Sequence, residues 1–208
     1  MTADDALAAV RDADAALAAL DPTPFPLPVG ELAAVVAGAV SALGRGDWWV
    51  PSVRERVGAV VRGVPVERLR HGLLGARPFK VAPPGGSPAV RALIAVGLAH
   101  ADPTGGALVH LGIGSASDGA FHEALNLAAL LRPNVVFVVS VHPLTGDAPL
   151  GRQLATTPAA LATAFGIDAV VIDGSDAAAV HAAVTAARAV PGPHLIEARL
   201  RVGQEVST

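Results

Sequence analysis

Apolar runs alternate with short polar breaks along the second half of the chain. Between residues 107 and 200 the pattern predicts four strands rich in β-branched residues, separated by three helices. The strands are expected at Ala107–Leu111, Val135–Ser140, Ala169–Ile172 and His194–Leu200, and the helices at Gly119–Leu131, Thr156–Phe165 and Asp176–Val190. Strands that are apolar throughout and alternate with helices are typical of a parallel sheet covered on both faces. We therefore expect a three-layer α/β/α domain with a mostly parallel sheet.

The first half of the chain predicts helices and connectors only. The helices are expected at Asp4–Leu20, Glu31–Leu43, Ser52–Arg62, Pro65–Gly75 and Ala89–Ala101. Four prolines within Asp21–Gly30 block a regular helix and indicate a linker. The pair Trp48 and Trp49 is expected in a connector, and Arg77–Pro88 in a loop. The predicted organisation is an N-terminal helix and linker (1–30) and one α/β domain (31–208), helical over 31–101 and alternating over 107–202.

Composition narrows the possible functions. Hydrophobic residues make up 52% of the chain but aromatic residues only 3%, so much of the apolar content is alanine. A core rich in alanine buries little area per residue, so additional burial against a partner chain is one interpretation. The other is that the alanine content reflects a bias in the source genome. A net charge of −3 argues against nucleic-acid binding, and the lack of cysteine excludes disulfides and thiolate chemistry. With an acidic N-terminus and no long apolar run, we expect a cytoplasmic protein without membrane contact.

A glycine turn follows the first strand of the alternating part. Gly112, Ile113 and Gly114 lead from that strand towards the next helix, where free N–H groups favour anions. A dinucleotide-binding fingerprint is disfavoured, because Ser117 holds the place of its third glycine and Ser140 that of its ribose-binding carboxylate. The Gly-Lys-Ser/Thr of a P-loop is absent. A small-anion or nucleotide site at Gly112–Ser117 remains one interpretation.

The segments around this turn carry a more specific pattern. The segments that carry it are FHEALN (Phe121–Asn126), DWWVPSVRE (Asp47–Glu55), GVP (Gly63–Pro65), VIDGSD (Val171–Asp176) and GPHLIEA (Gly192–Ala198). Together they resemble the alpha subunit of the first component of 2-oxo-acid dehydrogenases, of the pyruvate and branched-chain types, over roughly Leu32 to Val202. The resemblance implies the diphosphate domain of a thiamine-diphosphate-binding fold, with an N-terminal helical lead-in.

The resemblance also implies where the cofactor would be held. In that family a Gly-Asp-Gly turn and an Asn-Asn pair, separated by 26 residues, provide oxygen ligands for a divalent cation, usually Mg²⁺. The spacing is kept here, since 26 residues run from Ser115 to Ser140. The ligands are not kept: Ile113 stands in place of the Asp, and Val141 and His142 stand in place of the two Asn residues.

Further departures weaken the expected cofactor site. Isoleucine has no ligand atom, and imidazole suits Zn, Cu or Ni better than Mg²⁺. Val53 replaces a tyrosine that contacts the diphosphate in the family, although Arg54 is kept. We therefore expect no catalytic residue, no metal ligand and no bound cofactor. The vestigial cofactor-binding positions are Arg54, Gly112, Ile113, Gly114, Ser115, His142 and Leu144. His100 and His110 are expected to be structural.

The resemblance leads to two hypotheses of function, in addition to the anion or nucleotide site at Gly112–Ser117. The first is a shortened, degenerate alpha-subunit homologue with a structural or regulatory role, as a homo-oligomer or with a beta-subunit-like partner. The second is a working alpha-type subunit that holds thiamine diphosphate and Mg²⁺ through His142 and Leu144, and that oxidatively decarboxylates a 2-oxo acid together with a beta subunit. Alone, the chain is not expected to be an enzyme, because the family's cofactor lies between two kinds of subunit.

Overall fold

The computed structural model describes residues 1–20, 28–69, 77–83, 87–142, 144–145 and 148–201. Its centre is a five-stranded parallel sheet in the order β1-β2-β3-β7-β6. The strands are β1 (Trp48–Val50), β2 (Ala107–Gly112), β3 (Val135–Val141), β6 (Asp168–Asp173) and β7 (His194–Arg199). The expected strands of the second half are all present, which confirms the parallel α/β fold.

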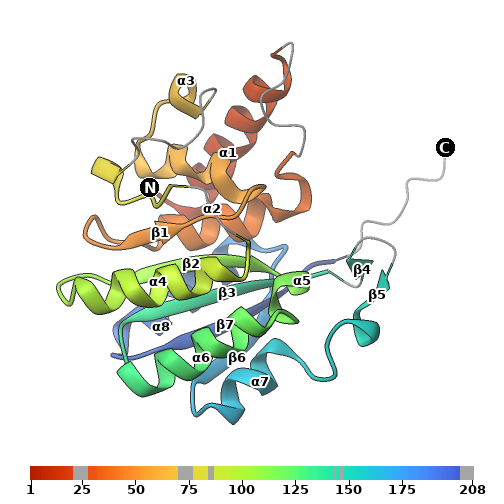
Figure 1. Cartoon of the computed structure of the whole chain (residues 1–208). Helices are drawn as coiled ribbons and strands as arrows, with labels where there is room; N and C mark the ends of the chain where they lie inside the picture. The colour runs from red at the N-terminus through yellow and green to blue at the C-terminus, as the bar shows by residue number, and fades with distance from the viewer. Residues whose placement is uncertain (21–27, 70–76, 84–86, 143, 146–147, 202–208) are drawn as a thin grey trace.

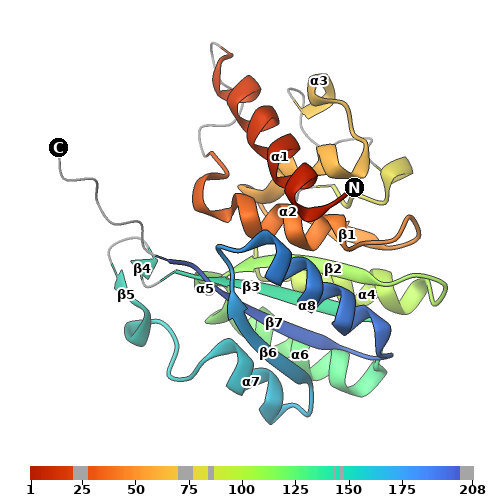
Figure 2. The ribbon, with the colours of Figure 1, turned by 180° about the vertical axis from the view of Figure 1, so that it is seen from behind.

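Helices cover both faces of this sheet. One face carries α4 (Val90–Ala101), α6 (Gly119–Leu131) and α7 (Pro158–Ala164), which lie in front of the strands in Figure 1. The other face carries α2 (Ala33–Ser41) and α8 (Ala177–Ala189), and α1 (Ala3–Ala18) packs against α2 (Figure 2). The division of the chain at residue 30 stays a prediction, although α1 also contributes Val10 and Leu17 to the same hydrophobic cluster as α2.

Local sequence signals set the helix starts. The side chains of Asp118, Thr157 and Asp176 accept hydrogen bonds from the first free N–H groups of α6, α7 and α8, as expected of N-cap residues. The observed bounds of α6 are those predicted. Pro158 occupies the first turn of α7, where its missing N–H costs nothing.

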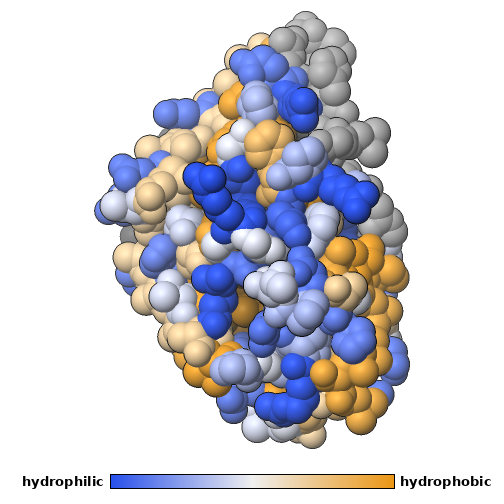
Figure 3. All heavy atoms as spheres, turned by 90° about the vertical axis from the view of Figure 1, so that its left-hand side faces the viewer, coloured by the Kyte–Doolittle hydropathy of each residue, from blue (hydrophilic) through white to orange (hydrophobic). Residues whose placement is uncertain are grey.

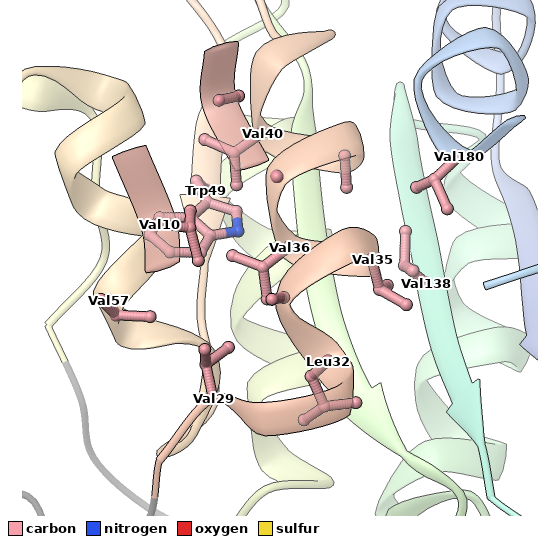
Figure 4. Close-up of a cluster of buried hydrophobic side chains, with 14 of the residues drawn as sticks. Val10, Val29, Leu32, Val35, Val36, Val40, Trp49, Val57, Val138 and Val180 are labelled. Atoms are coloured by element: carbon pink, nitrogen blue, oxygen red, sulfur yellow. The ribbon is translucent and has the colours of Figure 1, made fainter. Parts of the chain in front are cut away.

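Helix α2 is the centre of the larger hydrophobic cluster. Residues 33–40 are all buried, and a helix that is apolar on every side must be enclosed by other elements. Figure 4 shows the valines of α2 between Trp49 and Val57 on one side and Val138 and Val180 on the other. Gly38 permits a close approach to α8, since a Cβ there would lie 2.4 Å from the carbonyl oxygen of Ala177.

The first half differs from the prediction in several places. The expected connector around the tryptophans is strand β1, because Trp48–Val50 pairs with Ala107–Val109 and the N–H of Trp49 donates to the carbonyl of Lys80. The helix predicted from Ser52 is a 3₁₀ helix, η2 (Glu55–Arg62). Residues 70–76, in the helix predicted from Pro65, lie outside the described residues; α3 (Val66–Leu69) is its observed part.

Several short elements were not predicted. They are η1 (Gly30–Leu32), η3 (Arg77–Phe79), α5 (Ile113–Ala116), η4 (Leu150–Arg152) and the small antiparallel pair β4 (Leu144–Thr145) and β5 (Ala148–Pro149). The glycine turn is therefore largely a single helical turn, α5. Within the described ranges, no helix combines the length and the apolar character needed to cross a membrane.

Candidate functional site

A cleft of about 590 Å³ opens where β2 and β3 end. Carboxyl ends of parallel strands are the usual place for ligand sites in α/β proteins. The cleft is lined by Glu31, Leu32, Ser52, Val53, Arg54, Glu55, Pro88, Gly112, Ile113, Gly114, Ser115, Ser140, His142 and Leu200. A second, smaller cavity of about 170 Å³ is lined by Asp47 and Arg188 near the opposite ends of these strands, where those residues form an ion pair.

Parallel pairing brings the two halves of the expected motif together. Gly112, the last residue of β2, is the register partner of Ser140 near the end of β3. Helix α5 starts directly after Gly112, so Ile113, Gly114 and Ser115 lie beside the strand end that carries His142. Six of the seven predicted cofactor positions therefore line one cleft: Arg54, Gly112, Ile113, Gly114, Ser115 and His142.

The seventh predicted position is not among the lining residues. Leu144 belongs to β4, where it pairs with Pro149. The side chain of Ile113 is 3% exposed and belongs to the hydrophobic cluster shared with α4 and α6. The side chain at the position of the expected magnesium carboxylate is thus apolar and packed.

Arg54 has most of its hydrogen-bonding capacity satisfied by this chain. Its Nη1 donates to Oε1 of Glu31 at 3.0 Å, while Nε and Nη2 donate to the carbonyl oxygens of Pro28 and Val29 at 3.2 and 3.3 Å. Partial burial alone would raise the pKa of Glu31, but hydrogen bonds from Arg54 and from its own backbone, with the nearby charges of Arg54 and His142, hold that pKa below its usual range. The cleft therefore contains the counter-ion of its arginine.

Two residues that line the cleft each have a buried side-chain oxygen without a hydrogen-bond partner among the described residues. Glu55 is 3% exposed, and its Oε2 has no hydrogen-bond partner among the described residues. Oγ of Ser140 is likewise buried without such a partner. Burial raises the pKa of Glu55, against smaller opposing effects of its own backbone N–H, of Arg54 and Arg91, and of Ser52. Burial therefore disfavours the charged form of this carboxyl group, which is the form that binds a hard cation.

A further buried polar group lies deeper in the same face of the sheet. His110 on β2 is fully buried, and its ring lies edge-to-face with that of Trp49, with ring centroids 5.9 Å apart. Neither ring nitrogen of His110 has a hydrogen-bond partner among the described residues. Burial lowers the pKa of His110 to about 3, so the ring is neutral at physiological pH. His110 is not among the residues that line the cleft, and its structural role stays a prediction.

Sequence reasoning missed several residues of the cleft. Glu31 and Leu32 come from the turn before α2, and Pro88 and Leu200 come from segments with no motif of their own. Glu55 belongs to the segment DWWVPSVRE (Asp47–Glu55), and nothing in its sequence spacing indicates that its side chain is buried. The available signals that Glu55 belongs to the site were its neighbour Arg54 and the resemblance of that segment to a known family.

A metal site is not formed by the described side chains. Among them, no group of three or more His, Asp or Glu residues is placed to hold a metal ion. Ile113 offers no donor atom, and the nearest carboxylate to the arginine, that of Glu31, is paired with it.

Comparison with known proteins identifies the family to which this chain is similar. Residues 11–201 match the model of the dehydrogenase E1 component family. The chain is 35% identical over 185 residues to a 3-methyl-2-oxobutanoate dehydrogenase subunit alpha of Mycobacterium tuberculosis (strain CDC 1551 / Oshkosh), a match that covers 81% of this chain and 50% of that protein. It is 38% identical over 96 residues to a pyruvate dehydrogenase E1 component subunit alpha of Staphylococcus aureus (strain Mu50), covering 44% of this chain and 26% of that protein.

The match to the family model extends over most of the chain, from α1 to the residues after β7. The chain spans about half the length of the M. tuberculosis relative and less of the S. aureus one. The cleft, the parallel sheet and helix α6 all fall within the matched residues. The chain therefore belongs to the dehydrogenase E1 component family, as a homologue of its alpha subunits.

Proposed function

We propose that this chain is a degenerate alpha-subunit-type protein that no longer holds magnesium thiamine diphosphate in the manner of its family. Its role would be structural or regulatory and would operate through oligomerisation, as a homo-oligomer or with a beta-subunit-like partner. The observation that carries the proposal is the buried, apolar side chain of Ile113 at the place of the motif's carboxylate. Without that carboxylate little offsets the dehydration of Mg²⁺.

The charges around the cleft support the same conclusion. Arg54, the residue kept from the family's diphosphate contacts, is paired with Glu31 and with two backbone carbonyl groups. Glu55 adds a buried carboxyl group that would oppose an approaching diphosphate if it ionised. The described side chains thus do not fit a magnesium diphosphate.

A second candidate is supported by the cleft itself. A space of about 590 Å³ at the carboxyl ends of the strands is large enough for a cofactor fragment. On this alternative the chain is a working alpha-type subunit that oxidatively decarboxylates a 2-oxo acid with a beta subunit, and His142 with the backbone of Leu144 holds the metal.

Isothermal titration calorimetry separates the two candidates. With thiamine diphosphate and Mg²⁺ added together, we expect no binding with a dissociation constant below about 100 µM. That limit corresponds to a binding free energy on the order of 5 kcal/mol. Micromolar binding that EDTA abolishes would overturn the proposal and support the working subunit.

A restored ligand set gives the sharper test. We expect Ile113→Asp with Val141→Asn and His142→Asn to gain affinity for the cofactor by roughly tenfold or more, in a Mg²⁺-dependent way, because oxygen ligands are returned to the kept spacing. The matched control is Ile113→Leu with the same two Asn substitutions, which keeps the volume and lacks the carboxylate. Equal affinities of the two triple variants would show that position 113 is not the vacated ligand.

A further inference from the structure

The cleft at the carboxyl ends of β2 and β3, beside α5 in Figure 1, has several apolar side chains in its wall. They belong to Leu32, Val53, Pro88, Ile113 and Leu200. The opposite ends of the strands face the viewer in Figure 3, and the middle of that surface is largely hydrophilic. In the small cavity at those ends, the carboxylate of Asp47 already accepts hydrogen bonds from the N–H groups of Gly44 and Gly106. The cleft is therefore the place in this fold for a ligand with an apolar body.

Gly112 borders open space inside the cleft. A Cβ built on this residue would meet no atom within 4 Å, although Gly112 lines the cleft. Its φ of −84° and ψ of 159° are extended values that any residue adopts, so backbone conformation does not require glycine here. The missing side chain leaves room for a bound group against the end of β2.

The charged groups at the cleft compensate one another. Arg54 is held by Glu31 and by two backbone carbonyl groups. Burial raises the pKa of Glu55, and the nearby charges of Arg54 and Arg91 are among the effects that oppose this rise. Arg91 is not among the lining residues, and its Nη1 donates to the carbonyl oxygen of Pro51. An anion would have to displace Glu31 from Arg54, and a cation would lie near two arginines, so a neutral ligand is favoured.

The wall also contains polar atoms that lack a partner. Oε2 of Glu55 and Oγ of Ser140 are buried and have no hydrogen-bond partner within the described ranges. Such atoms are uncommon in folded proteins, because a buried polar group without a partner costs stability. A carboxamide group suits both side chains. Its N–H groups donate and its C=O accepts, so it pairs with a hydroxyl group and with a carboxyl group in either protonation state.

We propose that the cleft binds a small neutral molecule that joins an apolar body to a carboxamide-type group. The apolar body lies against Leu32 and Ile113. The amide group meets Glu55 and Ser140, whose side chains rotate about their own bonds to bring the buried oxygens to the ligand. The inference rests on the proposed function, since it assigns a ligand to a cleft that no longer holds magnesium thiamine diphosphate. It gives the regulatory role proposed there a ligand class.

Three probes of nearly equal shape test the preference for a neutral ligand: benzamide is neutral, benzoate anionic and benzamidine cationic. Titrations of the full isotopically labelled chain, followed through the backbone amide resonances of Gly114 and Ser115, give the dissociation constants. For a fragment of about nine non-hydrogen atoms, we expect benzamide to bind with a dissociation constant on the order of 1 mM. Benzoate and benzamidine should bind at least about tenfold more weakly, because each brings an uncompensated charge into the cleft. Equal affinities, or tighter binding of either charged probe, would overturn the proposal.

Glycine substitutions locate the bound probe. Gly112→Val fills the open space beside β2 and should weaken benzamide binding by about tenfold or more. Gly119→Val is the matched control, because a Cβ at Gly119 also meets no atom within 4 Å but this residue is not among those that line the cleft. The control should keep the benzamide affinity within about twofold of wild type. Equal effects of the two valines would overturn the proposal.

Two further substitutions test the polar contacts. Ser140→Ala should weaken benzamide binding by about threefold or more, whereas Ser41→Ala, which removes a half-buried hydroxyl group on α2, should not. Glu55→Gln keeps a donor and an acceptor and should stay within about threefold of wild type, while Glu55→Met should lose about tenfold or more.

Circular dichroism spectra show whether each variant keeps the fold. If Glu55→Met does not fold, Ser140→Ala and the three probes still decide the question. Unchanged benzamide affinity in Ser140→Ala, or in a folded Glu55→Met variant, would overturn the proposal. The titration with Mg²⁺ and thiamine diphosphate is read separately, so failure of the ligand class and failure of the proposed function give different results.

Discussion

Nη1 of Arg54 lies 3.0 Å from Oε1 of Glu31, a residue 23 positions earlier in the chain. The arginine that the family's motif keeps is therefore already neutralised before any ligand arrives. The side chains of this pair are 35% and 44% exposed, so solvent screens their attraction.

Glu31→Gln should release Arg54 for an external anion. We expect affinity for inorganic pyrophosphate, measured by calorimetry, to rise several-fold, on the order of 1 kcal/mol. The free energy of unfolding should change by less than about 1 kcal/mol, because the pair is half-exposed. Glu67→Gln removes the same charge at an exposed position on α3 that does not line the cleft. If both variants changed pyrophosphate affinity equally, net charge and not the Arg54 pair would be responsible.

Glu55→Gln should stabilise the protein at neutral and alkaline pH. The pKa of Glu55 is raised above 4.5 in the folded state, mainly by burial, so the folded protein holds this proton more tightly than the unfolded chain. The favourable contribution is fully present below pH 4.5 and is lost as the pH rises through the folded pKa, at about 1.4 kcal/mol for each pKa unit. Urea unfolding at about pH 4 and pH 8 should show the variant gaining stability over wild type only at the higher pH. An equal difference at both values would contradict this assignment.

His110→Phe should remove part of the protein's sensitivity to acid. Burial lowers the pKa of His110 from 6.5 to about 3, so the folded state resists protonation of this ring. Stability from this histidine is fully present above pH 6.5 and falls as the pH drops towards 3, by up to about 5 kcal/mol. Phenylalanine keeps an aromatic edge against Trp49, so the difference in unfolding free energy between variant and wild type should grow in the variant's favour as the pH falls. A difference in unfolding free energy that does not change with pH would contradict this assignment.

Gly38→Ala should destabilise the contact between α2 and α8. The added Cβ would lie 2.4 Å from the carbonyl oxygen of Ala177 and 2.8 Å from Cβ of Val180, so the two helices would have to move apart. Overpacking of this kind costs about 1 to 3 kcal/mol, which thermal or urea unfolding measures directly. Gly97→Ala, at a position in α4 where a Cβ would meet no atom within 4 Å, should instead be neutral or stabilising by up to about 1 kcal/mol. Equal effects of the two alanines would indicate that helix propensity, and not the close approach, governs position 38.

Much of the second half of the fold could be predicted from local patterns. Helix α6 was expected at Gly119–Leu131 and is found there, because Asp118 caps its first turn and its apolar positions repeat at helical spacing. Strand β3 was expected one residue shorter than observed. The grouping of Gly112–Ser115 with His142 was implied by the resemblance to the family, and the parallel pairing of β2 with β3 places these residues around one cleft.

The cleft's chemistry depended on contacts that no local pattern encodes. The sequence by itself determined the parallel α/β architecture and the family, and it has an isoleucine at position 113, where the resemblance implies a magnesium-binding aspartate. Only the tertiary structure decided that Trp48–Val50 is a strand, that Arg54 is paired with Glu31 and that Glu55 is buried beside the cleft. The reason is physical: periodicity and capping act within a few residues, whereas strand pairing, ion pairing and burial depend on segments that meet only when the chain has folded.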